Sequence, residues 1–124
     1  MEKSYGKELV LDMHNCDSSK FTREVITDFY KDICDKLEME RCDLHFWDDV
    51  DTPEEEKQTE PHLTGTSAIQ FIMTSNITIH TLDLLDKVFI NIFTCGHLDV
   101  DISKECALAH FGGEIVQSTE LVRK

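Results

Sequence analysis

The amino-acid sequence predicts an α+β domain: a two-layer sandwich in which a mainly antiparallel sheet carries two helices packed on one face. Three observations lead to this fold class. The chain has 124 residues, which is the size of one domain, so a single domain over residues 1–124 is expected. Several short segments alternate apolar and polar residues, whereas two segments have a helical period. The β-type segments follow one another through short connections, which favours hairpins over parallel crossovers.

The first half of the chain is predicted to form a strand, a helix and a second strand. Residues 7–14 alternate apolar and polar side chains, as a half-buried strand does. Asp17, Ser18 and Ser19 offer N-terminal caps for an amphipathic helix of about five turns. The apolar stripe of this helix consists of Phe21, Val25, Ile26, Phe29, Tyr30, Ile33 and Leu37. Residues 42–47 form the second short strand.

An acidic segment separates this half from a run of three strands. Residues 48–62, DDVDTPEEEKQTEPH, contain both prolines and no periodic pattern, so they predict a solvated loop. Residues 67–73, 77–81 and 87–94 are rich in Ile, Val, Phe or Thr and predict strands. Residues 83–86 supply the connection between the last two of these strands.

The C-terminal part is predicted to be a second helix followed by a last strand. Asp101 is the expected N-cap, and Gly112 with Gly113 is the expected stop. Residues 114–122 form the last strand. Ile102, Cys106 and Ala109 are expected to share one face of this helix.

The strand at residues 87–94 is apolar on both faces, which predicts a partner. One face presents Val88, Ile90 and Ile92. The other face presents Phe89, Asn91 and Phe93. Helices cover only one face of a two-layer sandwich, so a second subunit is the simplest cover for the other. A homodimer is expected.

Charge and composition exclude several function classes. The chain has 12 Lys and Arg against 25 Asp and Glu, a formal charge of −13, which repels nucleic acid and anionic lipid surfaces alike. No apolar run approaches the roughly 20 residues that span a bilayer, and the N-terminal residues lack the apolar core of a signal peptide. No nucleic-acid or membrane partner is expected, and the predicted location is cytoplasmic.

The cysteines and histidines give no metal or disulfide pattern. Five cysteines, an odd number, contain no CxxC pair, so neither a disulfide framework nor a zinc ribbon is indicated. The six histidines are scattered, and none forms HExxH. Most of the cysteines are expected to be buried free thiols, and no metal ligand is assigned.

Three polar residues within residues 74–96 carry the chemical interest. Taken singly, Ser75 fits an ordinary turn serine, His80 a hydrogen-bonded core histidine, and Cys95 a small buried side chain. Their common spacing is more informative. Gly65-Thr66-Ser67 is followed by Thr74-Ser75-Asn76-Ile77-Thr78-Ile79-His80-Thr81, and then by Phe93-Thr94-Cys95-Gly96.

This spacing resembles that of the short, prokaryotic-type S-adenosylmethionine decarboxylase proenzymes, a pyruvoyl-dependent family. The family signature runs Gly-Val-Ser/Thr, then Glu-Ser-His-x-Ser/Thr-x-His-Thr, then Phe-Thr-Cys-Gly, and this chain matches its register without a gap. The segments GKELVLD at residues 6–12 and NCD at residues 15–17 also look like the family's opening strand and turn. The resemblance therefore covers nearly the whole chain.

The resemblance implies a self-processing enzyme. Ser75 would attack the carbonyl of Thr74, the chain would be cut between these two residues, and Ser75 would become the pyruvoyl cofactor. Ser67 would hydrogen-bond the reacting carbonyl, and His80 would remove the Cα proton during elimination. Cys95 would later protonate the substrate carbon after CO2 leaves. No diffusible cofactor is implied. The expected substrate is S-adenosylmethionine, as a source of aminopropyl groups for spermidine.

The chain departs from the family pattern at positions that concern the substrate. Thr74 replaces the Glu before the cleaved bond, and Asn76 replaces the His after Ser75. Pro61 stands where the family has an adenine-stacking Phe, and Leu84 where it has a ribose-binding Glu. The residues that could compensate are Asp83 or Asp86 for the carboxylate, and His62, Phe46 or Trp47 for the aromatic surface.

Two alternatives to S-adenosylmethionine decarboxylation remain open at the level of sequence. A pyruvoyl-dependent decarboxylase of arginine or ornithine would need no adenine contact, and an acidic surface would attract such basic amino acids. An unprocessed homologue that binds a metabolite or a partner subunit is the alternative without catalysis.

Overall fold

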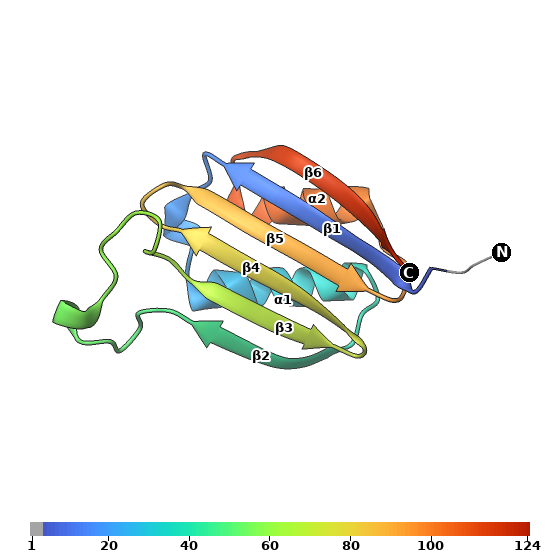
Figure 1. The fold of residues 1–124 in the computed structure, drawn as a ribbon, viewed down its shortest axis with the longest axis horizontal. Helices are drawn as coiled ribbons and strands as arrows, with labels where there is room; N and C mark the ends of the chain where they lie inside the picture. The colour runs from blue at the N-terminus through green and yellow to red at the C-terminus, as the bar shows by residue number, and fades with distance from the viewer. Residues whose placement is uncertain (1–3) are drawn as a thin grey trace.

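A computed structural model describes residues 4–124 and shows one six-stranded sheet with both helices on one side of it (Figure 1). The strand order is β2-β3-β4-β5-β1-β6, and every neighbouring pair is antiparallel. This arrangement confirms the predicted α+β two-layer sandwich. The strands are β1 Gly6–His14, β2 Arg41–Trp47, β3 Ser67–Ile72, β4 Ser75–Leu82, β5 Lys87–Thr94 and β6 Glu114–Arg123, and the helices are α1 Arg23–Lys36 and α2 Val100–Phe111.

The first helix begins later than the sequence predicts. Asp17 caps a short 3-10 turn, Ser18–Lys20, where its carboxylate accepts a hydrogen bond from the Ser19 amide. The N-cap of α1 is Thr22, whose hydroxyl accepts from the Val25 amide at 3.2 Å. Phe21 is buried but lies before the helix, because the 3-10 turn already directs its ring into the core.

The second helix also differs in its start and in its inner face. Asp99 is the N-cap in place of Asp101, because its carboxylate accepts from the Ile102 amide at 3.0 Å. Of the three residues expected to share a face, Cys106 is buried, Ile102 is half-buried and Ala109 is exposed. The buried positions of α2 are Ser103, Cys106, Ala107 and Phe111.

The core lies between the helices and one face of the sheet. Alternate residues of the central strands bury their side chains there, among them Leu9, Leu11, Met13, Ile77, Ile79, Val88, Ile90 and Ile92. From the helices come Ile26, Phe29, Tyr30, Ile33 and Phe111. The Tyr30 hydroxyl donates to the Ala68 carbonyl at 3.0 Å, which fixes α1 over β3. The two layers thus share one apolar interior.

Within residues 4–124, no helix lies over the opposite face of the sheet (Figure 1). Phe89, Asn91 and Phe93 are half-buried there. Trp47, at the end of β2, is 82% exposed. A large exposed aromatic residue beside an apolar strand is typical of an interaction surface, and we call this side of the sheet the open face.

The acidic segment at residues 48–62 leaves the sheet after β2 and returns before β3 (Figure 1). Glu54–Glu56 form a 3-10 turn, and the neighbouring residues up to Pro61 are exposed. Arg23 anchors the start of the segment by two hydrogen bonds to the carboxylate of Asp48, at 2.7 and 2.8 Å. Among residues 4–124, neither helix is long and apolar enough to cross a membrane.

Candidate active site

Strand β4 carries two separate groups of candidate residues, one at each end. Ser75 is its first residue, and His80 is five residues further along. At about 3.4 Å per residue, the two lie about 17 Å apart. Ser75 also follows the alternation of Ile77 and Ile79, which face the helices, whereas His80 lies on the open face. One chain therefore does not bring Ser75 and His80 together.

The turn before Ser75 holds an unusual backbone conformation. Ile72 and Ser75 are paired across β3 and β4, so only Met73 and Thr74 connect the strands. The sequence analysis placed Ser75 in this connection, but the ladder includes it. Thr74 has φ of 63°, a left-handed value that a β-branched residue rarely adopts. Such a conformation costs on the order of 1–3 kcal/mol, and it is located at the peptide bond that the sequence predicts to be cleaved.

Cys95 joins Thr74 and Ser75 from the end of β5. Its Sγ lies 3.0 Å from the Thr74 hydroxyl, and its amide donates to the Ser75 hydroxyl at 3.3 Å. Hydrogen bonding by Thr74, and then by Ser75, lowers the pKa of the exposed Cys95 thiol. Gly6 packs behind this group, because a Cβ there would lie 2.8 Å from the Cys95 Cα. We call Thr74, Ser75 and Cys95 the serine end of the site.

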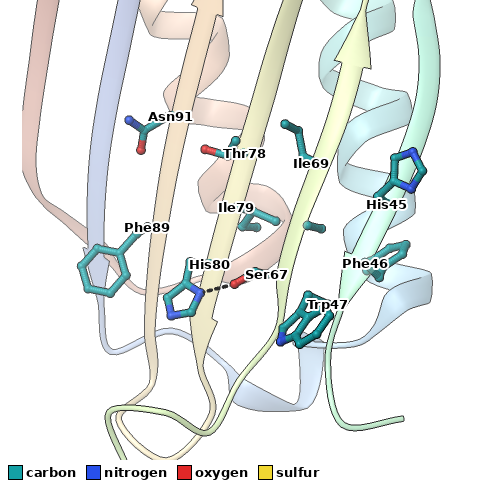
Figure 2. A pocket seen from close by; sticks show the side chains of 11 residues that line it. His45, Phe46, Trp47, Ser67, Ile69, Thr78, Ile79, His80, Phe89 and Asn91 are labelled. Carbon is teal, nitrogen blue, oxygen red and sulfur yellow. Dashed lines mark hydrogen bonds between the residues drawn. The ribbon is translucent and has the colours of Figure 1, made fainter. Parts of the chain in front are cut away.

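The other group forms at the far ends of β3 and β4. Ser67 is the register partner of His80, and the Ser67 hydroxyl lies 2.6 Å from Nδ1 of His80 (Figure 2). The imidazole stacks on Phe89 of β5, with ring centroids 6.4 Å apart. Gly65 allows the chain to pass close to β4, since a Cβ there would lie 1.7 Å from the Thr81 carbonyl oxygen. Ser67 and His80 are called the histidine end.

The residues predicted to contact substrate cluster at the histidine end. Trp47 and His62 line a hollow of about 330 Å³ together with Ser67 and His80. Asp83 lies just beyond, where the Thr81 hydroxyl donates to its carboxylate at 3.1 Å. Burial raises the pKa of the Asp83 carboxyl, and the Thr81 hydrogen bond and nearby His80 oppose this rise.

The positions that depart from the family pattern contribute no wall to this hollow. Pro61 is exposed within the acidic segment, and Leu84 is 59% exposed in the β4–β5 connection. Trp47 also lines a second hollow of about 530 Å³ on the open face, shared with His80 and Phe89 (Figure 2). An aromatic surface is therefore present near His80, although it comes from β2.

Phe89 is the residue that the sequence analysis did not assign to the site. It was read only as one apolar residue of a two-faced strand. Its role as the stacking partner of His80 follows from the register that pairs the two across β4 and β5. A pairing of residues 77–81 with 87–94 through a short connection would have indicated this contact.

Comparison with known proteins now adds to the geometry. The sequence profile described as S-adenosylmethionine decarboxylase matches residues 7–124, which is nearly the whole chain. The chain belongs to the S-adenosylmethionine decarboxylase family. The resemblance drawn from the motifs is thus confirmed.

Two relatives support the same membership over a shorter span. The S-adenosylmethionine decarboxylase proenzymes of Geobacillus sp. (strain WCH70) and Geobacillus kaustophilus (strain HTA426) are each 34% identical to this chain over 59 residues. The match covers 48% of this chain and 48% of each relative, so the chain spans about half the length of the relatives it matches.

A solved structure shares the fold. The crystal structure of the adenosylmethionine decarboxylase from Aquifex aeolicus VF5 superimposes with a TM-score of 0.73 at 17% sequence identity. The superposition covers 98% of this chain and 92% of that one. At this identity the likeness establishes the architecture.

Proposed function

We propose that this chain is the precursor of a pyruvoyl-dependent decarboxylase that acts on S-adenosylmethionine and supplies spermidine synthesis in the cytoplasm. The observation that supports this most directly is the serine end. A left-handed Thr74 precedes Ser75, and the Cys95 thiol lies 3.0 Å from the Thr74 hydroxyl, within a chain of this family.

Maturation begins with the Ser75 hydroxyl, which attacks the Thr74 carbonyl carbon. The C–N bond between the residues breaks as the ester forms, and the Ser75 amine is freed. Loss of the Ser75 Cα proton then expels the Thr74 carboxylate, and water releases ammonia to leave a ketone at residue 75. The residues fit this chemistry because Thr74 is exposed in a strained left-handed conformation directly before the Ser75 hydroxyl. The pyruvoyl group supplies a ketone that captures the substrate amine and accepts electrons during decarboxylation.

The proton removed from Cα requires a base, and the nearest one proposed is about 17 Å away on the same chain. A homodimer would resolve this separation. A two-fold axis that lies between two open faces and runs across the strands brings the end of each sheet that carries the Thr74–Ser75 bond level with the end that carries the partner's His80. The half-buried Phe89, Asn91 and Phe93 would be covered by the same contact.

In this arrangement each residue has a distinct role. The partner's Ser67 hydrogen-bonds the reacting carbonyl, and the partner's His80 removes the Cα proton, with its ring held by Phe89 and the Ser67 hydroxyl. Cys95 remains beside residue 75 and returns a proton to the substrate carbon after CO2 leaves. The lowered pKa of its thiol makes Cys95 a better proton donor than an ordinary cysteine.

The substrate follows from the aromatic and acidic residues at the histidine end. Trp47 offers a flat surface for adenine, and Asp83 offers a carboxylate for the ribose or the amine. A stacking contact is worth about 1–3 kcal/mol per base. Loss of the Trp47 ring should therefore weaken S-adenosylmethionine binding by roughly 5- to 150-fold.

Release of labelled CO2 from S-adenosylmethionine, arginine and ornithine tests the proposal. We expect turnover of S-adenosylmethionine, with KM raised in Trp47→Ala and little changed in the control Trp47→Phe. Efficient turnover of arginine or ornithine without S-adenosylmethionine turnover would replace the proposed substrate. A chain that stays uncleaved and releases no CO2 would favour the homologue without catalysis.

A further inference from the structure

A group of three metal-ligand side chains lies between the two helices, on the face of the sheet opposite His80. Asp32 of α1 faces Cys106 and His110 of α2. The Asp32 Oδ2 atom lies 2.9 Å from Nε2 of His110 and 3.3 Å from Sγ of Cys106. All three ligand atoms lie within 4.8 Å of one another.

The local geometry of the helices creates this group. Cys106 and His110 are four residues apart in α2, so they lie on the same face one turn apart. This is the spacing by which the two histidines of HExxH hold zinc. Asp32 reaches the same point from α1, which packs against α2 through Phe29 and Phe111. Sequence inspection misses the group because Asp32 is 74 residues from Cys106.

The distances are close to those of a tetrahedral metal site. With Zn–N and Zn–O bonds of about 2.1 Å and a Zn–S bond of about 2.3 Å, the N···O edge is about 3.4 Å and the S···O edge about 3.6 Å. The observed separations of 2.9 and 3.3 Å differ from these values by a few tenths of an ångström. Small side-chain movements would therefore bring the three donors within bonding distance of one metal ion.

We propose that Asp32, Cys106 and His110 bind one divalent transition-metal ion of the zinc class, with a water molecule as the fourth ligand. The side chains of Asp32 and His110 are 32% and 20% exposed, so an ion can enter from solvent. His110 lies in the last turn of α2, where the helix dipole favours a cation. The formal charge of −13 on the chain also favours the binding of a cation.

Two protein groups must change when the ion binds. Burial raises the pKa of the Cys106 thiol to about 12, so the metal must displace its proton to solvent. The Lys36 ammonium, now 3.2 Å from Asp32 Oδ2, must turn away. Lys36 thus competes with the metal ion for the Asp32 carboxylate. Removal of the Lys36 charge should strengthen metal binding, whereas removal of a ligand should weaken it. Binding there is independent of the proposed decarboxylase activity.

Titration of the full chain with Co²⁺, followed by displacement with Zn²⁺, tests the site. We expect one equivalent of Co²⁺ to give a thiolate charge-transfer absorption that Cys106→Ser removes. His110→Gln should weaken affinity about tenfold or more, since even residues that only orient a ligand cost 10–100-fold. Lys36→Gln should tighten binding, and the control Cys42→Ser, which alters an exposed thiol, should leave it unchanged.

Several results would overturn the proposal. An absorption band that survives Cys106→Ser, or one that Cys95→Ala removes, would assign the metal to another thiol. Equal affinity in the Lys36→Gln, His110→Gln and unmodified chains would reduce the group to a hydrogen-bond network around Asp32. Lys36→Gln and His110→Gln change partly exposed side chains, so they decide whether the metal binds here even where Cys106→Ser fails to fold.

Discussion

The two ends of β4 differ in how their candidate residues are arranged. At the serine end, Thr74 is left-handed and the exposed Cys95 thiol has a lowered pKa. At the histidine end, His80 is held between the Ser67 hydroxyl and the ring of Phe89. The serine end combines a strained backbone conformation at Thr74 with the Ser75 hydroxyl, and the histidine end holds the His80 imidazole in a fixed orientation. The comparison teaches that the residues grouped by the family motif lie about 17 Å apart when they belong to a single chain.

The largest effect is expected from the substitution that removes the proposed nucleophile, the Ser75 hydroxyl. Ser75→Ala should leave the chain at full length, because no other oxygen occupies the position that attacks the Thr74 carbonyl. Denaturing mass spectrometry should show two fragments for the unmodified chain and one species for the variant. Ser19→Ala, which changes an exposed serine far from the turn, should still be cleaved. Cleavage of Ser75→Ala at the same bond would rule out self-processing through Ser75.

The next test places the intact Ser75 and the intact His80 on different chains. His80→Ala alone should stay uncleaved, and so should Ser75→Ala alone. When both variants are co-expressed, the His80→Ala chain should be cleaved, because its intact Ser75 meets the partner's His80. At most half of the chains are then cut, and mass spectrometry identifies which.

The matched control replaces the second chain by one carrying both Ser75→Ala and His80→Ala. No His80 is then available to the remaining Ser75, so cleavage should vanish. Cleavage of His80→Ala by itself would remove His80 from the mechanism. Absence of rescue in a mixture that light scattering shows to be dimeric would confine the reaction to one chain.

Loss of the thiol should separate maturation from turnover. Cys95→Ala should still be cleaved but should release CO2 about 10²–10⁴-fold more slowly, the range expected for a lost proton donor. Turnover is measured per cleaved chain, so slow processing does not enter the comparison. Cys42→Ala, at another exposed cysteine, is the control and should match the unmodified chain. Equal rates for both variants would exclude Cys95 as the proton donor.

The sequence was sufficient for the fold because alternation reports burial on each strand directly. Residues 7–14 and 87–94 pair as strands, and the period of four over residues 25–33 marks α1. The boundaries were less accessible. Asp17 has the side chain of a helix cap, yet it caps a 3-10 turn, and only the direction of the chain after it decides between the two.

The candidate site was predictable as a set of residues and not as an arrangement. The motif spacing grouped Ser67, Ser75, His80 and Cys95, and the structure divides them into two pairs. The reason is that Ser75 belongs to β4, which extends the strand two residues beyond the predicted start at Ile77. An extended strand separates residues that a turn would have kept close.

The strain at the serine end is open to measurement. In a Ser75→Ala background, which keeps the chain uncleaved, Thr74→Gly should raise the free energy of unfolding by about 1 kcal/mol. Glycine adopts positive φ without a steric penalty, which relieves about 1–3 kcal/mol, while its greater chain entropy costs about 0.5–1 kcal/mol. Urea unfolding gives the difference. Thr78→Gly, within β4, should destabilise the chain, and a loss of stability in Thr74→Gly would mean that the turn is unstrained.

The smallest effect concerns the protonation of Cys95. The Thr74 hydroxyl is the main cause of the lowered pKa of the Cys95 thiol, because it can turn its proton from the Met73 carbonyl oxygen, 2.6 Å away, to the thiolate. Thr74→Val removes this hydroxyl and keeps the β-branched shape, so the thiol pKa should rise and the thiolate should form at higher pH. In a chain that also carries Ser75→Ala and Cys42→Ser, the pH midpoint of Cys95 alkylation should therefore move upward, with slower alkylation below that midpoint. The same double variant with Thr74→Ser, which keeps a hydroxyl, should retain the lower midpoint. An unchanged midpoint in Thr74→Val would show that the Thr74 side chain does not lower the pKa of the Cys95 thiol. The serine end would then depend on its backbone conformation, whereas the histidine end depends on the contact between the Ser67 and His80 side chains.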